Sequence, residues 1–238
     1  MKRWMQCLLA CAAVAPGVLP AAPRWDGGLA LATDNLLRGV SRSSNDPALA
    51  ADAQVLFPSG VFGSLWASTS RPRETQDTTV EFAATIGFGV ALRGDWAIRA
   101  SYAHYESPWQ EREDFYRYDE LAVDLRYRER LFFSVAWSPN TSRYGSRYGV
   151  AWDEEAFAYE ASFQQPIRSG LRAHAGVGYY DLSALFGEGY WYGSMGLGWA
   201  RGHWQADLSW VDTDSSAEHL STAGTAGSRV LFVLGLRF

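Results

Sequence analysis

Apolar and polar residues alternate along most of the chain with a period of two. The stretch 121–128 shows the pattern clearly: its odd-numbered residues are Leu, Val, Leu and Tyr, and the residues between them are Ala, Asp, Arg and Arg. Successive side chains of a β-strand point to opposite faces, so this stretch predicts a strand with one apolar and one charged face.

The same alternation recurs often enough to predict twelve antiparallel strands. Most of the segments have close to the ~9–11 residues with which a tilted strand crosses a membrane. They lie near 27–38, 49–57, 61–70, 78–92, 96–106, 117–128, 131–138, 155–165, 171–182, 189–200, 203–213 and 228–238.

The connections between these segments alternate in length. Short ones lie at 58–60, 93–95, 129–130, 166–170 and 201–202, and longer ones at 39–48, 71–77, 107–116, 139–154, 183–188 and 214–227. Short periplasmic turns and longer extracellular loops are typical of up-and-down barrels of the outer membrane. The expected fold is therefore all-β, a transmembrane barrel with both termini on the short-turn rim.

The chemistry of the two faces favours a membrane barrel over a soluble sandwich, the alternative fold with tryptophans in its core. A soluble barrel hides its apolar face, whereas a membrane barrel turns that face outward. Here the polar face carries many small residues that suit a confined lumen, and the apolar face carries large ones. Trp96, Trp137, Trp199 and Trp204 fall at predicted strand ends, where an aromatic girdle would lie.

The N-terminal residues 1–22 resemble a secretory signal peptide, which leaves 23–238 as one barrel domain. Lys2 and Arg3 precede a short apolar run broken by Pro16-Gly17, and small residues follow at 21–22. A lipoprotein cleavage site at Cys11 is a weaker reading, because the apolar run before it is very short. Both cysteines of the chain lie in this segment, so no disulfide is expected in the mature protein.

Charge and hydropathy exclude two classes of protein. The mean hydropathy of −0.18 is too low for a bundle of membrane helices. After removal of the signal peptide, 19 of the 21 basic residues remain against 26 acidic ones, a net charge of −7. This balance argues against a nucleic-acid partner.

The charged face of the predicted strands would line the lumen. Acidic and basic members are nearly balanced, which predicts a narrow pore with weak ion selectivity, or a lumen closed by ion pairs. The lumen-facing candidates are Glu81, Arg99, Glu120, Asp124, Arg126, Arg128, Glu160, Arg172, His174, Asp207, Arg229 and Arg237. The loop 139–154 is long enough to fold inward and constrict such a pore.

No catalytic, cofactor or metal site is expected. Asp212, Asp214, Glu218 and His219 cluster in the last long loop, but such a run is more often a solvated loop near lipopolysaccharide than a cation site. His219 precedes Ser221 at the spacing of some lipid hydrolases of the outer membrane. The pair lies in a loop rich in small residues, where no third group is assigned to orient the base.

Two regions of the chain resemble the TorF-type porins, a family labelled Gcw_chp. The specific part is a T-D-x-x-x-R-G-x-S…D-P-A pattern from Thr33 to Ala48, followed by 59–68; the endings 204–214 and 229–238 also look similar. The chain departs from the family at 35–37, where an aromatic residue before the arginine is more usual. The resemblance implies an outer-membrane barrel with a porin label, and no active-site residues.

These patterns together predict a porin that lets small hydrophilic solutes diffuse passively across the outer membrane of a Gram-negative bacterium, without a cofactor. A non-conducting barrel that binds a partner or braces the membrane is the alternative, and a lipid-modifying enzyme a distant third. Expected partners are outer-membrane lipid, lipopolysaccharide and, during biogenesis, the barrel assembly machinery. The terminal Phe238 resembles the last-strand signal for that machinery.

Overall fold

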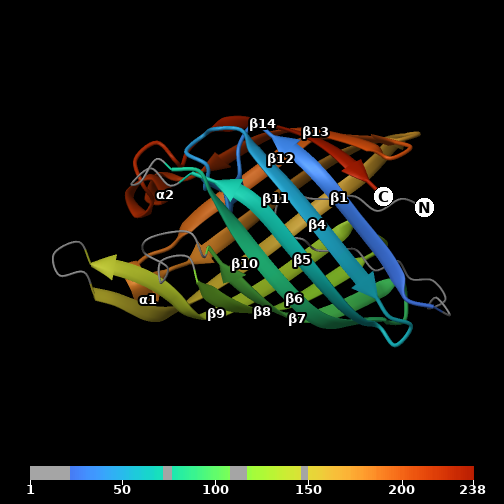
Figure 1. Cartoon of the computed structure of the whole chain (residues 1–238), viewed down its shortest axis with the longest axis horizontal. Helices are drawn as coiled ribbons and strands as arrows, with labels where there is room; N and C mark the ends of the chain where they lie inside the picture. The colour runs from blue at the N-terminus through green and yellow to red at the C-terminus, as the bar shows by residue number, and fades with distance from the viewer. Residues whose placement is uncertain (1–21, 72–76, 108–116, 146–149) are drawn as a thin grey trace.

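The protein is a closed antiparallel β-barrel of twelve strands (Figure 1). The computed structural model describes residues 22–71, 77–107, 117–145 and 150–238, and describes side chains for all of these except 142–152. The predicted signal segment therefore lies, except for Ala22, outside the described residues. The predicted fold class is confirmed.

Every strand of the barrel pairs with two neighbours, and β1 pairs with β14 to close it. Since a closed barrel has no edge, all strand backbone groups can be paired within the wall. The wall strands are β1 (Arg24–Ala32), β4 (Ala48–Leu56), β5 (Val61–Ser70), β6 (Thr79–Ala91), β7 (Trp96–Glu106), β8 (Tyr118–Tyr127), β9 (Leu131–Gly145), β10 (Val150–Arg168), β11 (Leu171–Asp181), β12 (Tyr190–Arg201), β13 (Trp204–Thr213) and β14 (Arg229–Arg237).

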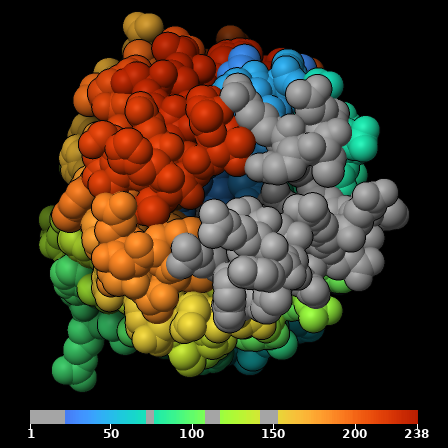
Figure 2. All heavy atoms as spheres, turned by 90° about the vertical axis from the view of Figure 1, so that its left-hand side faces the viewer, coloured from blue at the N-terminus to red at the C-terminus, as the bar shows by residue number. Residues whose placement is uncertain are grey.

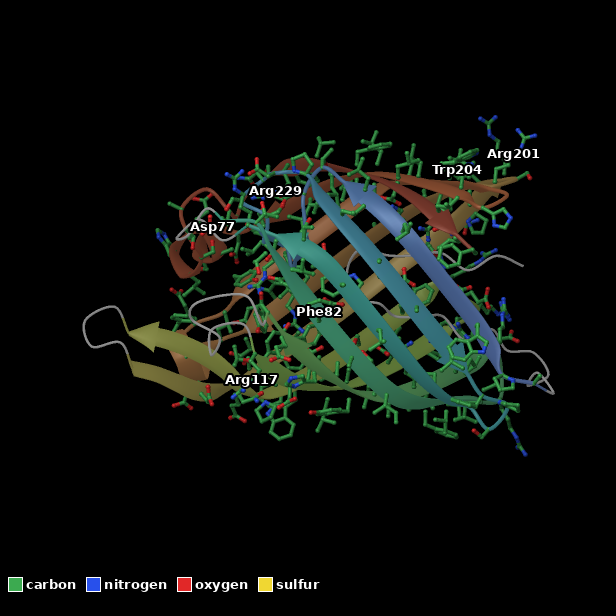
Figure 3. All side chains as sticks on the ribbon, viewed as in Figure 1. Asp77, Phe82, Arg117, Arg201, Trp204 and Arg229 are labelled. Atoms are coloured by element: carbon green, nitrogen blue, oxygen red, sulfur yellow. The ribbon has the colours of Figure 1, made fainter. Side chains whose placement is uncertain are left out.

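The two rims of the barrel differ as predicted. One rim, the turn rim, holds the short connections, the start of β1 and the end of β14, at the right of Figure 1. The other, the loop rim, holds the long connections, among them α1 (Ser183–Phe186) and α2 (Ser215–Leu220). Figure 3 shows Arg201 and Trp204 at the turn rim, and Asp77 and Arg229 at the loop rim. No helix in the described ranges is long and apolar enough to cross a membrane.

Two boundary predictions were wrong in ways that matter for the lumen. The first strand ends at Ala32 rather than at residue 38, and the chain then turns inward. The expected loop 139–154 is mostly strand, because β9 and β10 stay paired up to Gly145 and Val150. These paired strand ends project beyond the loop rim (Figure 1), and residues 146–149 of the predicted loop lie outside the described residues.

The outer face of the barrel is apolar, which excludes a sandwich with a hidden apolar core. Large side chains that strands of the wall expose include Leu29, Leu31, Leu65, Ile86, Phe88, Leu121, Val123, Phe133, Val135, Val177, Met195, Leu197, Leu208, Trp210, Val230, Phe232 and Leu234. Trp96 and Trp204 begin their strands, and Trp199 lies near the end of β12. Trp137 lies inside β9 rather than at its end, because that strand is longer than predicted.

Candidate functional site: the lumen

The segment between β1 and β4, residues 33–47, folds into the barrel at the loop rim; it is called the inward segment below. It contains a small hairpin, β2 (Leu36–Leu37) and β3 (Val40–Ser41), with Arg38 and Gly39 at its tip. Both tip residues have positive φ, 50° and 80°, as a two-residue type I′ turn requires. In Figure 2, which looks onto this rim, blue atoms of the N-terminal region lie deep in the central hollow.

The tip of the hairpin reaches across the lumen. Arg38 Nη2 donates to Glu120 Oε2 at 2.5 Å, and Glu120 belongs to β8, five strands from β1 in a wall of twelve. The Arg38 guanidinium also lies over the Tyr180 ring, 4.3 Å from its centroid. Burial lowers the pKa of Arg38, but the Glu120 carboxylate and the neighbouring tyrosines together outweigh this, and the net pKa lies well above its ordinary value. The tip is therefore a permanent cation held at the far wall.

Gly39 allows the tip to lie close to the wall. A Cβ at this position would come 2.6 Å from Thr213 Cγ2 and 3.0 Å from Tyr192 Cβ. Only glycine combines the positive φ with so close an approach. The type I′ turn and the close approach to the wall thus explain why the motif has glycine after Arg38.

The base of the inward segment is held by a second set of polar contacts. Asp34 accepts hydrogen bonds from the hydroxyls of Ser41 at 2.6 Å and Ser43 at 2.7 Å, and from Arg229 Nη1 at 3.0 Å. Arg42 pairs with Glu81 of β6 at 2.9 Å. The segment therefore contacts β6, β8 and β14, which lie on different sides of the barrel.

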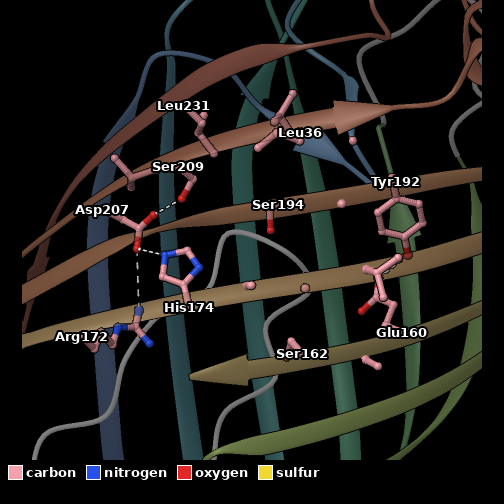
Figure 4. Close-up of a pocket in the computed structure, with 18 of the residues that line it drawn as sticks. Leu36, Glu160, Ser162, Arg172, His174, Tyr192, Ser194, Asp207, Ser209 and Leu231 are labelled. Atoms are coloured by element: carbon pink, nitrogen blue, oxygen red, sulfur yellow. Dashed lines mark hydrogen bonds and ion pairs between the residues drawn. The ribbon is translucent and has the colours of Figure 1, made fainter. Parts of the chain in front are cut away.

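A cavity lies beneath the inward segment, between β10 and β14 (Figure 4). It comprises about 1090 Å³ of space, including its open mouth. Glycines on the inner face of the wall let the lining side chains lie close against it: a Cβ on Gly196 would lie 2.6 Å from Ser209 Oγ and 2.9 Å from His174 Nε2. Above these side chains the interior on this side is left hollow.

One end of the cavity carries a network around Asp207. The carboxylate lies 2.9 Å from His174 Nε2 and 3.8 Å from Arg172 Nη2, and it accepts a hydrogen bond from the Ser209 hydroxyl. Arg172 Nη1 also donates to Gln164 Oε1 at 2.7 Å. Asp207 stands between His174 and Ser209, so the histidine is not placed to activate that serine as a base would be.

The other end of the cavity carries Glu160. Its Oε1 accepts a hydrogen bond from the Tyr192 hydroxyl at 2.5 Å. Glu160 forms no ion pair with any described residue, which sets it apart from Glu81, Glu120 and Asp207.

Most of the remaining lumen candidates lie in pairs on the inner face. Arg99 pairs with Asp124 at 2.9 Å, and Arg237 Nη1 pairs with Asp52 at 2.6 Å. Arg126 is buried, and its Nη1 and Nη2 make no hydrogen bond to a described residue.

Arg128 was predicted to face the lumen, but it does not. β8 ends at Tyr127, so Arg128 begins the turn with a φ of 51°. Its side chain is 60% exposed and pairs with Asp95 of the neighbouring turn. The alternation therefore stops one residue before it.

Several lumen residues were not predicted, notably Asp34, Arg38, Arg42 and Asp52. The first three lie where the period of two fails after Ala32, and that failure, together with the Arg-Gly pair, is the signal that could have located them.

Side-chain hydrogen bonds of Asp214 anchor the last long loop. Asp214 caps α2 by accepting from Ala217 N, and it also accepts from Trp191 N. The Ser221 hydroxyl donates to Ala217 O at 2.6 Å rather than to His219. No three His, Cys, Asp or Glu side chains gather in a metal-binding arrangement within the described parts of the chain.

Solved structures with a similar fold are porins. The chain resembles the NanC porin with a TM-score of 0.59 and 11% identity, over 90% of this chain and 99% of that one. It resembles the KdgM porin with a TM-score of 0.55 and 6% identity, over 90% and 98%. The structure of KdgM in complex with disordered oligogalacturonate gives a TM-score of 0.53 at 6% identity, over 90% of this chain and 97% of that one.

At such low identity the likeness concerns the fold alone. No curated protein matches the chain in sequence. The model of a family described as "Bacterial protein of unknown function (Gcw_chp)" matches residues 21–233. The chain therefore belongs to the Gcw_chp family, as its sequence motifs predicted, and it has the barrel fold of porins.

Proposed function

We propose that the protein is a channel of the Gram-negative outer membrane through which small hydrophilic solutes diffuse passively. The observation that carries the proposal is the inverted distribution of polarity: large apolar side chains on the outside, and charged and small side chains around an inner cavity. Lipid is the environment that such an outer face fits, and water is what such an interior fits.

The pore is narrow because the inward segment crosses it. Twelve strands alone enclose a lumen of intermediate width, between packed eight-stranded barrels and open sixteen-stranded ones. The Arg38–Glu120 pair, only 1% and 3% exposed, fixes the tip of that segment to the far wall of the lumen near the loop rim. Passage is therefore limited to solutes that fit around the inward segment or that displace it.

Ion selectivity should be weak. Most charges on the inner face are paired with an opposite charge, as Arg99 is with Asp124 and Arg42 with Glu81. A solute meets a wall whose charges nearly cancel, so neither sign of ion is strongly preferred. The channel requires no turnover and no cofactor.

The second candidate is a non-conducting barrel whose loops bind a partner. The observation that favours it is the pair of buried ion pairs, Arg38–Glu120 and Arg229–Asp34, that fix the inward segment to the wall. If these ion pairs never break, the inward segment closes the loop rim.

Two partners belong to the proposal. Lipopolysaccharide would meet the loop rim. The barrel assembly machinery would bind the end of β14, where Phe238 extends the pairing with β1 through two backbone hydrogen bonds with Gly27 and leaves its ring exposed.

Liposome swelling tests the channel against the non-conducting barrel. Protein purified from outer membranes is reconstituted, and swelling rates are compared for a pentose, a disaccharide and a tetrasaccharide. We expect the rate to fall steeply with solute size. A rate equal to that of empty liposomes for every sugar would contradict the proposal and favour the non-conducting barrel.

A further inference from the structure

We infer that the cavity beneath the inward segment binds a small organic cation, an ammonium group attached to an apolar body. The inference rests on the proposed channel function and deepens it, because it names the class of solute that would dwell in the lumen. It is carried by three features of the cavity wall: a carboxylate that no described cation pairs with, hydroxyl groups that bond to no described residue, and apolar side chains in the same lining (Figure 4).

The carboxylate is Glu160. It is half-buried and accepts one hydrogen bond, from Tyr192, but no arginine or histidine of the described residues pairs with it. A carboxylate at the wall of a confined lumen lacks part of its hydration, so it attracts a cation more strongly than it would in water. Its second oxygen, Oε2, is available for that contact.

Two hydroxyl groups adjoin this carboxylate along the cavity wall. Ser162 on β10 and Ser194 on β12 line the cavity, are half-buried, and make no hydrogen bond to any described residue. Both face the same hollow as Glu160 (Figure 4). Gly176 lies between the two serines in the sheet, so their hydroxyl groups are two strands apart. An ammonium group has several N–H donors and could donate to the Glu160 carboxylate and to one of these hydroxyl oxygens together.

The apolar part of the lining is formed by Leu36 of the inward segment and by Val211, Leu231 and Val233 of the last two strands, which pack against one another. Figure 4 shows Leu36 and Leu231 in the same cavity lining as Ser194 and His174. Burying an alkyl or aryl group against such side chains contributes about 25 cal/mol per Å². A bound solute would therefore gain from an apolar body as well as from its charge.

Other classes of ligand fit less well. A divalent metal ion needs several oxygen ligands at once, and no such group of acidic side chains is found among the described residues. An anion would meet Glu160 directly, while Arg172 at the other end is already engaged by Gln164 and Asp207. A neutral polyol would use the hydroxyl groups but not the apolar surface.

The test measures binding of benzylammonium to the folded barrel in detergent by calorimetry, with benzyl alcohol as the uncharged probe. We expect benzylammonium to bind and Glu160→Gln to weaken its binding about tenfold or more, a loss of about 1.4 kcal/mol. Glu188→Gln, in the exposed connection after α1, is the matched control and should leave binding unchanged. Leu231→Asn should also weaken binding, through the apolar surface.

Equal binding of benzyl alcohol, equal binding by the Glu160→Gln variant, or no binding to the wild type would each overturn the inference. Heat-modifiable migration in electrophoresis shows whether each variant is folded. Calorimetry does not depend on conduction. Binding of benzylammonium by a barrel that passes no solute would therefore contradict the proposed channel function but would still support the binding site.

Discussion

The two halves of the lumen are enclosed by the same twelve strands but are filled in opposite ways. Near the loop rim, charged side chains of the inward segment meet charges of the wall and are almost fully buried, as Arg38 and Glu120 are. Beneath that segment, between β10 and β14, a cavity remains beside half-buried polar groups such as Glu160.

This difference separates two tasks within one barrel. The loop-rim half sets whether and how widely the lumen is open, because its contacts join segments far apart in the chain. The cavity half sets which solutes dwell there, because its polar groups face open space. Deletion of Phe238 affects the barrel that both halves share. The other variants change one half of the lumen at a time.

Deletion of Phe238 should have the largest effect. The residue adds two backbone hydrogen bonds between the chain end and Gly27 and presents an exposed ring. We expect the amount of folded barrel in the outer membrane to fall several-fold, measured as the heat-modifiable band in membrane fractions. Phe238→Tyr, which keeps an aromatic end, is the control. An unchanged folded yield after the deletion would refute the assembly role.

Replacement of residues 34–46 by a short Gly-Ser linker should open the loop-rim half. It removes the hairpin and its contacts with β6, β8 and β14, so the conductance of single channels should rise several-fold. The matched control shortens the projecting ends of the paired strands β9 and β10. An equal rise in both variants would mean that the inward segment is not the constriction.

Glu120→Gln should have an intermediate effect. Removing one partner of a buried ion pair typically costs about 3–5 kcal/mol, so the hairpin tip should be released part of the time. We expect noisier currents with larger open steps, while Glu106→Gln, at the exposed end of β7, should not differ from wild type. If the currents of Glu120→Gln match those of the wild type, the Arg38–Glu120 ion pair does not control opening of the pore. Wild-type currents in the double variant Arg38→Glu, Glu120→Arg would confirm that this ion pair holds the hairpin tip.

Ser194→Phe should have the smallest effect, confined to the cavity half. The larger side chain fills part of the hollow, so conductance should fall modestly without added noise. Met195→Phe is the matched control, since the neighbouring side chain on β12 points outward. A fall of the same size in the control would show that the change acts through the barrel wall and not through the cavity.

The strands were predictable because one physical pattern governs them all. A strand between lipid and lumen must alternate, and β4 to β8 and β11 to β14 lie within about two residues of their predicted positions. β9 and β10 were predicted too short because their polar outer parts leave the apolar environment, where pairing continues without alternation.

The inward segment was not predictable from periodicity. Leu36 and Leu37 follow the polar residues Thr33, Asp34 and Asn35, and Leu36 lines the cavity inside the lumen. Its position depends on contacts with β6, β8 and β14, which are distant in sequence. Likewise, the sequence placed Glu160 and His174 on the inner face, but which charges they meet depends on the register of strands around the barrel.

Single-channel recording in a planar bilayer tests the central claim most directly. For the wild-type protein, purified from outer membranes, we predict discrete current steps of small size and a reversal potential near zero in a salt gradient. Stable insertion without current steps, in the wild type and in the variant that lacks residues 34–46, would contradict the claim that this barrel is a channel narrowed by its inward segment.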